Sequence, residues 1–405
     1  MQRGSNLPAV SAYNQALVLD LIRRSPEGLS RVELASRTGL SVQTLSNVTR
    51  RLSDEELIIE AGKVISGPGK PRTILALNAR SRFAVGVHLD PAVDTVVVVD
   101  MAGSVIARAE HPPGRSHDTH NLVATMADAV VDIIARAGID ANRVLGIGIA
   151  APGPLDTDAG RLLDPPLLPA WHGVELRTEL HAATGMPTIL EKDVAAAVIG
   201  ELWLAREEDS RDSLFLYYGA GIGAGLALSG LPVRGRTANA GNIAHLGVDR
   251  AGPVCECGSI GCLGVALEPD TLLRLAGLRS GESGELPDDP RPELDRLRER
   301  VEAGDATATA VIDDAARRLA RGLVQLDNML DVDVAVVGGP VWVRLAPVLR
   351  EPLRRHLASD PAALTTRPLK LRDSRLGPDA AAVGAACLLL DGAYTARTSD
   401  LFITE

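Results

Sequence analysis

The chain has 405 residues, enough for two or three domains, and it carries a net charge of −10 at neutral pH. Its first ten residues, MQRGSNLPAV, lack the charged and then apolar pattern of a secretory signal, and no apolar run approaches the ~18 residues of a transmembrane helix. These features argue against a secreted or membrane-spanning protein, so we expect a cytoplasmic protein with reduced cysteines.

The charge is unevenly distributed along the chain. Residues 1–80 contain eleven Lys and Arg against seven Asp and Glu, a net of +4, which leaves −14 on residues 81–405. A mildly basic N-terminal segment followed by an acidic remainder predicts that only the N-terminal segment binds an anionic partner.

The N-terminal segment, residues 1–80, is expected to contain three helices. Apolar residues at helical spacing predict a first helix over residues 14–24. A capping box at Ser30 starts a second helix, which ends at Gly39 because glycine suits a left-handed C-terminal turn. Ser41 can cap a third helix over residues 42–52. This arrangement is typical of a helix-turn-helix.

The third helix has one apolar and one polar face. Leu45, Val48 and Leu52 form its apolar stripe. The polar face carries side chains that can read base edges or grip phosphates: Gln43, Thr44, Asn47 and Arg50.

Two strands, over residues 57–59 and 73–77, are expected to flank a basic wing tip, KVISGPGKPR. Its Lys70 and Arg72 suit the phosphate backbone. A small protein-interaction module with a solvated basic loop is the alternative. The capped helices, the polar face and the basic wing together favour binding to double-stranded DNA.

Residues 78–82 are the expected junction, so we place a DNA-binding domain at residues 1–80 and an effector-binding and dimerisation domain at 81–405. Strands are predicted over residues 83–89, 95–100, 144–150, 187–190, 214–218, 226–228 and 334–337, and helices over 121–137 and 194–206. Alternation of strands and helices predicts an α/β fold.

The glycine-rich run 219–225 can be a phosphate-cradling loop, although a tight hairpin explains it equally well. A charged, loop-like insertion is expected near residues 281–291. Cys387 lies in the apolar run 380–390, which predicts a buried core position.

The stretch AGNIAHLGVDRAGPVCECGSIGCLG, residues 240–264, holds three of the four cysteines. His245, Cys255, Cys257 and Cys262 offer the donor set of a closed, tetrahedral Zn²⁺ site, and the interspersed glycines permit sharp turns between ligands. Three free thiols in a glycine-rich loop are the alternative. The tight spacing favours a structural zinc knuckle.

This stretch resembles the zinc signature of the ROK family (repressors, open reading frames and kinases), a Gly-His pair followed by C-x-C-G-x-x-G-C-x-E. The metal ligands match in order and spacing, but Ala244 replaces the Gly and Gly264 replaces the final Glu. A weaker resemblance runs from about residue 83 to about residue 391. It implies the two-lobed actin-like ATPase fold. ROK proteins are sugar kinases or sugar-responsive repressors, and the repressors carry an N-terminal winged helix-turn-helix.

The resemblance also implies that a kinase site has been eroded. Where the kinases have an Asp-x-Gly-Gly-Thr phosphate loop, this chain has HLDPA, residues 88–92. Three expected sugar contacts are replaced by Leu167, Asn242 and Gly264. The catalytic-base position survives as Asp193.

We take four residues as candidate effector contacts: Lys192, Asp193, Asn242 and His245. Asp193 can instead be an ordinary first residue of a helix, favoured there by the helix dipole. Lys192 replaces an Asn of the kinases, and it either points to solvent or favours an anionic ligand.

The sequence therefore predicts a non-enzymatic, homodimeric, zinc-containing transcriptional regulator, a repressor of carbohydrate-related genes that responds to a sugar or an anionic sugar derivative. One alternative is an active ATP-dependent sugar kinase with an appended DNA-binding domain. Another is a regulator without a small-molecule effector.

Overall fold

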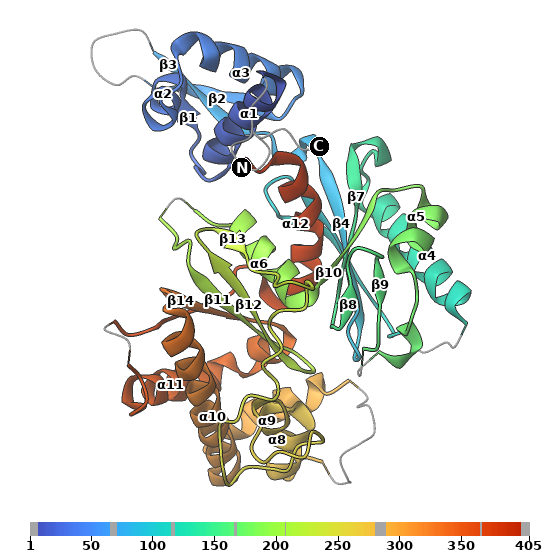
Figure 1. The fold of residues 1–405 in the computed structure, drawn as a ribbon, viewed down its shortest axis with the longest axis vertical. Helices are drawn as coiled ribbons and strands as arrows, with labels where there is room; N and C mark the ends of the chain where they lie inside the picture. Colours follow the sequence, from blue (N-terminus) through green and yellow to red (C-terminus); the bar gives the residue numbers. More distant parts are fainter. Residues whose placement is uncertain are drawn as a thin grey trace.

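The computed structural model of the chain describes residues 7–64, 71–114, 118–165, 168–206, 208–279, 289–364 and 367–397. A small N-terminal module lies at one end of a larger body made of two lobes (Figure 1). Within these ranges, no helix combines the length and the hydropathy that crossing a membrane requires.

The N-terminal module is a winged helix-turn-helix, as the sequence predicts. Its helices are α1 (Leu7–Arg23), α2 (Arg31–Thr38) and α3 (Val42–Asp54), and its strands are β1 (Leu29–Ser30), β2 (Ile58–Val64) and β3 (Arg72–Leu77). The strands form one sheet in the order β1-β3-β2, so the wing is the β2–β3 hairpin. The wing tip with Lys70 lies outside the described residues.

The predicted caps set the helix boundaries in this module. Ser30 Oγ accepts a hydrogen bond from the Glu33 backbone N–H, and Glu33 Oε2 accepts one from the Ser30 N–H at 2.8 Å, which completes the capping box. Gly39 has φ 70°, the left-handed conformation expected after α2. Ser41 Oγ accepts from the Thr44 N–H at 3.1 Å and starts α3.

The first lobe is built on a five-stranded sheet in the order β10-β7-β4-β5-β6. Its strands are β4 (Phe83–His88), β5 (Asp94–Asp100), β6 (Val105–His111), β7 (Val144–Ala151) and β10 (Thr188–Lys192), with α4 (Thr119–Ala137) and α5 (Leu176–Thr184) on one side. A small hairpin of β8 (Leu155–Asp156) and β9 (Arg161–Leu162) and short 3₁₀ turns, including Pro169–Trp171, complete it. Strand β6 and helix α5 are not among the elements predicted from the sequence.

The second lobe repeats this plan. Its sheet has the order β13-β12-β11-β14-β15, from β11 (Ser213–Tyr218), β12 (Ile222–Leu228), β13 (Leu231–Pro232), β14 (Val334–Gly338) and β15 (Lys370–Asp373). Its helices are α7 (Leu263–Leu267), α8 (Pro269–Leu275), α9 (Arg291–Glu302), α10 (Ala306–Leu330) and α11 (Pro340–Ser359). In each lobe three antiparallel strands are followed by two parallel ones. This repeated plan is the expected two-lobed α/β architecture.

The predicted insertion at 281–291 lies largely outside the described residues, and α9 begins at its last residue, Arg291.

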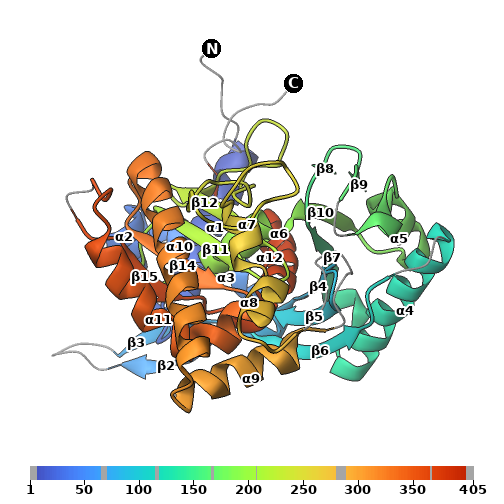
Figure 2. The same ribbon diagram turned by 90° about the horizontal axis from the view of Figure 1, so that it is seen from below.

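Two helices rich in small residues pack between the lobes (Figure 2): α6 (Asp193–Trp203) and α12 (Ala380–Tyr394). They approach so closely that a Cβ built on Gly200 would lie 2.9 Å from the Cα of Gly384. Because larger side chains would separate them, the alanine and glycine content follows from this packing. Cys387 on α12 is fully buried, as predicted.

The N-terminal module docks on the end of this helix pair. The Trp203 indole N–H donates to the Met101 carbonyl at 3.1 Å, and the guanidinium carbon of Arg23 on α1 lies 4.1 Å from the Trp203 ring centroid. Met101 is buried in the core of the N-terminal module, against which Tyr394 of α12 also packs. The module therefore shares a packed contact with the body.

Candidate functional site

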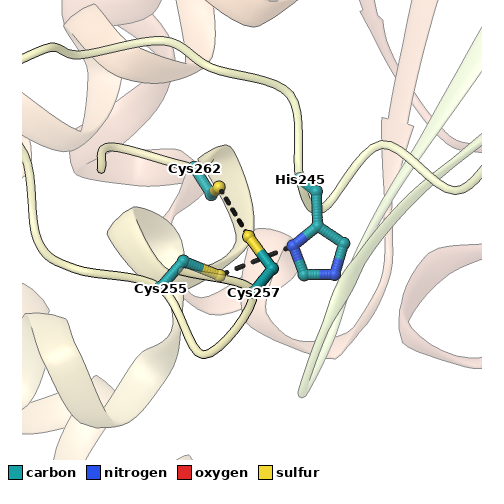
Figure 3. A group of neighbouring side chains, drawn as sticks. All are labelled: His245, Cys255, Cys257 and Cys262. Carbon is teal, nitrogen blue, oxygen red and sulfur yellow. Dashed lines mark hydrogen bonds between the residues drawn. The ribbon is translucent and has the colours of Figure 1, made fainter. Parts of the chain in front are cut away.

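Four side chains meet beside the second lobe (Figure 3): His245, Cys255, Cys257 and Cys262. Their donor atoms all lie within 4.8 Å of one another. Nδ1 of His245 is 3.5 Å from the sulfur of Cys255, and the sulfurs of Cys257 and Cys262 are 3.7 Å apart. The cluster predicted from the sequence is therefore assembled.

Tight turns hold this cluster together. The Cys255 N–H donates to the Ser259 carbonyl at 2.8 Å, and the Gly258 N–H donates to the Cys255 carbonyl at 2.9 Å. Gly261 has φ 71°, and a Cβ built on it would lie 1.5 Å from the Asp249 carbonyl oxygen. Only glycine fits there, which explains one of the glycines between the ligands.

The donor geometry fits zinc. Ligands at Zn–S and Zn–N distances of about 2.3 and 2.0–2.1 Å place two sulfurs about 3.8 Å apart and a sulfur and a nitrogen about 3.5 Å apart in a tetrahedron. The corresponding separations in the cluster are 3.7 and 3.5 Å. The four residues can therefore hold a tetrahedral metal ion such as Zn²⁺.

A cavity of about 520 Å³, here called the cleft cavity, lies between the lobes next to the cluster. All four predicted effector contacts line it: Lys192, Asp193, Asn242 and His245. Lys192 and Asp193 come from the end of β10 and the start of α6, whereas Asn242 and His245 come from the loop that follows β13. The tertiary structure thus brings together residues about 50 positions apart in sequence.

Lys192 does not point to solvent, which corrects one of the two readings of this residue. It is 3% exposed, and its ammonium donates to the carbonyls of Asn239 and Ala240 at 3.1 and 3.0 Å and to Oδ1 of Asn242 at 2.6 Å. An ammonium has three N–H donors, and here each has an oxygen acceptor. Its charge therefore anchors the 239–242 loop and is not directed at a ligand, which also weakens the case for an anionic effector.

Asp193 is both the first residue of α6 and a wall of the cleft cavity. Its Oδ1 accepts from the Val194 backbone N–H at 2.7 Å. Burial raises the pKa of its carboxyl group, and the neighbouring His88 partly opposes that shift. Asp193 can therefore both start helix α6 and contact a ligand in the cleft cavity.

The loop after β4 uses its own backbone donors. The Asp90 N–H donates to Oδ1 of Asp94 at 3.3 Å, and the Ala92 N–H donates to Oδ1 of Asp90 at 2.9 Å. Pro91 between them has no N–H. The loop therefore directs none of these three positions at a phosphate, in agreement with its altered sequence.

The glycine-rich run 219–225 forms a hairpin. The turn closes where the Gly219 N–H donates to the Gly221 carbonyl at 2.9 Å, and β12 already begins at Ile222. Ala220, Gly221 and Gly223 still line the cleft cavity, so the run is both a hairpin and part of the cavity wall.

The predicted DNA-reading face of α3 is turned outward. Leu45, Val48 and Leu52 are buried in the module core, whereas Gln43 and Arg50 are exposed and Thr44 and Asn47 are half-buried. The Arg50 guanidinium donates to Oδ1 of Asn47 at 3.3 Å, and Arg72 is exposed at the start of β3.

Several residues on α3 and in the cleft cavity are not among the contacts predicted from the sequence. On α3, Ser46 is exposed on the same face as Asn47, and Val42 is 78% exposed. In the cleft cavity, His88 at the end of the central strand β4 and Asp90 just after it also line the wall, although the sequence placed them in the altered phosphate loop and not among the effector contacts. Glu268, between α7 and α8, gave no signal in the sequence.

Comparisons with known proteins agree with this architecture. A model of the ROK family matches residues 92–392. The chain is 25% identical to the putative xylose repressor of Caldicellulosiruptor sp. (strain Rt8B.4), over 95% of this chain and 97% of the relative. It is also 25% identical to the glucokinase of Halalkalibacterium halodurans, over 76% of this chain and 95% of the relative.

Among solved structures, a ROK family transcriptional regulator described as a homologue of the E. coli MLC protein superposes with a TM-score of 0.75 at 23% identity. The match covers 95% of this chain and 97% of that one, which establishes a shared fold along nearly the whole length.

Proposed function

The chain belongs to the ROK family, and from that membership we propose that it is a DNA-binding transcriptional regulator, a repressor of carbohydrate-related genes controlled by a small-molecule effector. The observation that carries the proposal is the outward polar face of α3 in a winged helix-turn-helix placed ahead of the two lobes. The repressor relative supports it by matching 95% of this chain, whereas the glucokinase relative matches 76%.

The DNA contacts would come from α3 and the wing. Gln43, Thr44, Asn47 and Arg50 would lie in the major groove, and Lys70 and Arg72 would contact the phosphate backbone. The net charge of +4 on residues 1–80 supports DNA contacts within this segment alone, because the acidic remainder of the chain repels DNA.

The effector would bind in the cleft cavity against Asp193, Asn242 and His245. These side chains offer a carboxylate, an amide and an imidazole, which suit the hydroxyl groups of a sugar or sugar derivative. Lys192 would act indirectly, by holding Asn242 in place.

We further propose that the regulator binds as a homodimer, and that its operator is correspondingly two-fold symmetric, with half-sites one helical turn or a multiple apart. The test begins by selecting preferred DNA sequences with the full-length protein. A symmetric site is the expected result, and selection of a single half-site would contradict the dimer.

The first prediction uses this selected operator. Asn47→Ala should weaken binding to it by roughly 5- to 150-fold, because a bidentate base contact is worth about 1–3 kcal/mol, while binding to random DNA should change little. Fluorescence anisotropy at fixed salt measures both affinities.

Asn142→Ala, which alters an exposed Asn in the first lobe, is the matched control and should leave both affinities unchanged. An equal loss on operator and random DNA for Asn47→Ala would show that Asn47 does not read bases.

A further inference from the structure

The walls of the cleft cavity carry four carboxyl side chains, those of Asp90, Asp193, Glu256 and Glu268. Asp90 follows β4 and Asp193 follows β10 in the first lobe, whereas Glu256 lies between two cysteines of the metal cluster and Glu268 lies between α7 and α8. The described residues that line the cavity include no arginine and a single lysine, Lys192. The lining is therefore acidic on both sides of the cleft.

None of these four carboxyl groups forms an ion pair with an arginine or a lysine of the described residues. Lys192 does not pair with them, because its three N–H donors already have oxygen acceptors outside this set. Buried carboxylates nearby are paired: Glu191 with Arg234 at 2.5 Å and Glu201 with Arg372 at 2.9 Å. The cleft cavity thus differs from its surroundings in holding carboxylates without a cation.

Glu256 and Glu268 are the most available of the four. Both residues are exposed and line the cavity, and their side chains make no hydrogen bond to any described residue. Asp90 and Asp193, in contrast, each use one carboxyl oxygen to accept a backbone N–H. A ligand in the cavity can therefore reach two glutamates whose acceptor sites are free.

The surroundings of Glu268 disfavour further negative charge. Partial burial raises the pKa of its carboxyl group, and the charges of Asp270 and Glu256 add to that shift, which Arg274 partly opposes. An opposite charge close by stabilises the ionised carboxylate. A bound cation would therefore offset the repulsion between the two glutamates.

The charge of the ligand follows from these walls. A cleft lined by charges of one sign concentrates ions of the opposite sign. A phosphate or a carboxylate would be repelled, and a neutral sugar would leave the carboxylates without a counter-charge. An ammonium group supplies a positive charge and three N–H donors, and its hydrogen bonds to carboxylates are stronger than those between neutral groups.

We propose that the effector is an amino sugar with a free, protonated amine, whose ammonium group pairs with Glu256 and Glu268. This rests on the proposed function, which supplies the sugar and its hydroxyl contacts. Glu256 is adjacent to Cys255, whose sulfur lies 3.5 Å from Nδ1 of His245, so the two glutamates adjoin those contacts. A cavity of about 520 Å³ is within the usual range for a small-molecule site.

Titration calorimetry of the full-length protein at about pH 6.5, where amines are protonated, tests the charge of the ligand. The probes are glucosamine, galactosamine and mannosamine, each compared with its parent hexose and its N-acetyl derivative. At least one amine should bind roughly ten- to hundredfold more tightly than both neutral counterparts, the range for one charge-assisted hydrogen bond. Putrescine, an acyclic diamine, should bind more weakly, because it has no hydroxyl groups for Asn242 and His245.

One variant locates the amine. Glu268→Gln keeps the shape of the side chain and removes its charge, so it should weaken binding of the amino sugar roughly tenfold or more and leave the affinity for the parent hexose nearly unchanged. Glu351→Gln, at an exposed position on α11, is the matched control and should change neither affinity.

The outcomes separate this inference from the proposed function. Neutral hexoses that bind as tightly as their amines, or unaltered amine binding in Glu268→Gln, would overturn the amine assignment and leave a sugar effector standing. Putrescine binding more tightly than every amino sugar would overturn the assignment to a sugar. If no sugar of any charge binds, the effector part of the proposed function fails as well.

Discussion

His245 lines the cleft cavity and also belongs to the metal cluster. Its Nδ1 faces the sulfur of Cys255, so metal binding through this atom leaves the other ring nitrogen available to a ligand. A bound Zn²⁺ would fix the orientation of the imidazole, as a structural site with four protein ligands does. We therefore expect metal and effector responses to depend on each other.

The corresponding prediction concerns zinc content. The purified protein should contain about one zinc per chain, because four ligands form a closed site. Cys257→Ser should lower that content severalfold and reduce the effector response. Elemental analysis measures the first effect and operator binding the second.

Cys387→Ala, at the buried cysteine outside the cluster, is the control and should retain zinc. A wild-type protein without zinc, or a Cys257→Ser protein with full zinc and full response, would contradict a structural metal site.

Asp94 provides a second prediction for a single residue. Burial raises the pKa of its carboxyl group from 3.8 to about 7. The folded state therefore keeps a proton that the unfolded state releases, so the free energy of unfolding should fall as the pH rises from about 4 to about 7. The free energy of unfolding should fall by on the order of 4 kcal/mol in total, because each unit of difference between the folded-state and unfolded-state pKa corresponds to about 1.36 kcal/mol.

Asp94→Asn should remove this contribution, so its stability relative to the wild type should increase across that pH window. Urea unfolding at pH 4.5 and pH 7.5 measures the difference. Asp128→Asn, at an exposed position on α4, is the matched control. A constant difference between Asp94→Asn and the wild type at both pH values would show that Asp94 ionises normally.

At the scale of whole elements, α6 connects the cleft cavity with the N-terminal module. It begins at Asp193, which lines the cavity, and ends at Trp203, which contacts Met101 and Arg23. Its 11 residues span about 16 Å at 1.5 Å per residue. Because α6 packs tightly on α12, a displacement at one end should move the other.

This arrangement predicts the effect of Trp203→Leu. Losing the indole N–H and the ring under Arg23 should reduce the effector-induced change in operator affinity severalfold, while operator affinity without effector stays near that of the wild type. The measurement is anisotropy with and without the sugar that a thermal-shift screen identifies.

Trp203→Phe, which keeps a ring but not the donor, should give an intermediate response. An undiminished response in Trp203→Leu would exclude α6 as the connection.

At the scale of the whole molecule, the chain is similar over most of its length to a glucokinase as well as to a putative repressor, so catalysis must be judged from the loops. Phosphoryl transfer needs the phosphates and Mg²⁺ held in line with the acceptor hydroxyl. The loop after β4 uses the N–H groups of Asp90 and Ala92 internally. By the family resemblance, His88 takes the place of the Asp of the kinases' phosphate loop, the carboxylate expected to organise the metal. A neutral imidazole is a poor ligand for Mg²⁺, which prefers oxygen.

We therefore predict no sugar-dependent release of ADP when the protein is incubated with ATP, Mg²⁺ and a panel of hexoses, pentoses and amino sugars. Loss of several groups that act together should abolish activity rather than reduce it in proportion. ADP release that requires sugar and disappears in Asp193→Asn would instead establish an active kinase.

The sequence by itself determined the features that depend on neighbouring residues. The caps at Ser30 and Ser41 and the turn at Gly39 are local hydrogen bonds and dihedral preferences, so they could be read from short patterns. The four metal ligands lie within 18 residues, and their residue types alone show that they offer one imidazole nitrogen and three thiol sulfurs. The alternation of strands and helices gave the α/β class, whereas the two-lobed plan needed the family resemblance.

Only the tertiary structure decided the features that depend on distant partners. Strand β6 was missed because its charged Arg108 and Glu110 are typical of a surface loop, yet they pair with Asp379 and Arg291, 271 and 181 residues away. In the sequence, Lys192 has no evident partner for its charge. In the structure, its ammonium donates to three oxygens from residues 47 to 50 positions further along the chain. The burial of a charged group and the identity of its charged or polar partners depend on residues far apart in the sequence, so a local sequence pattern does not predict them.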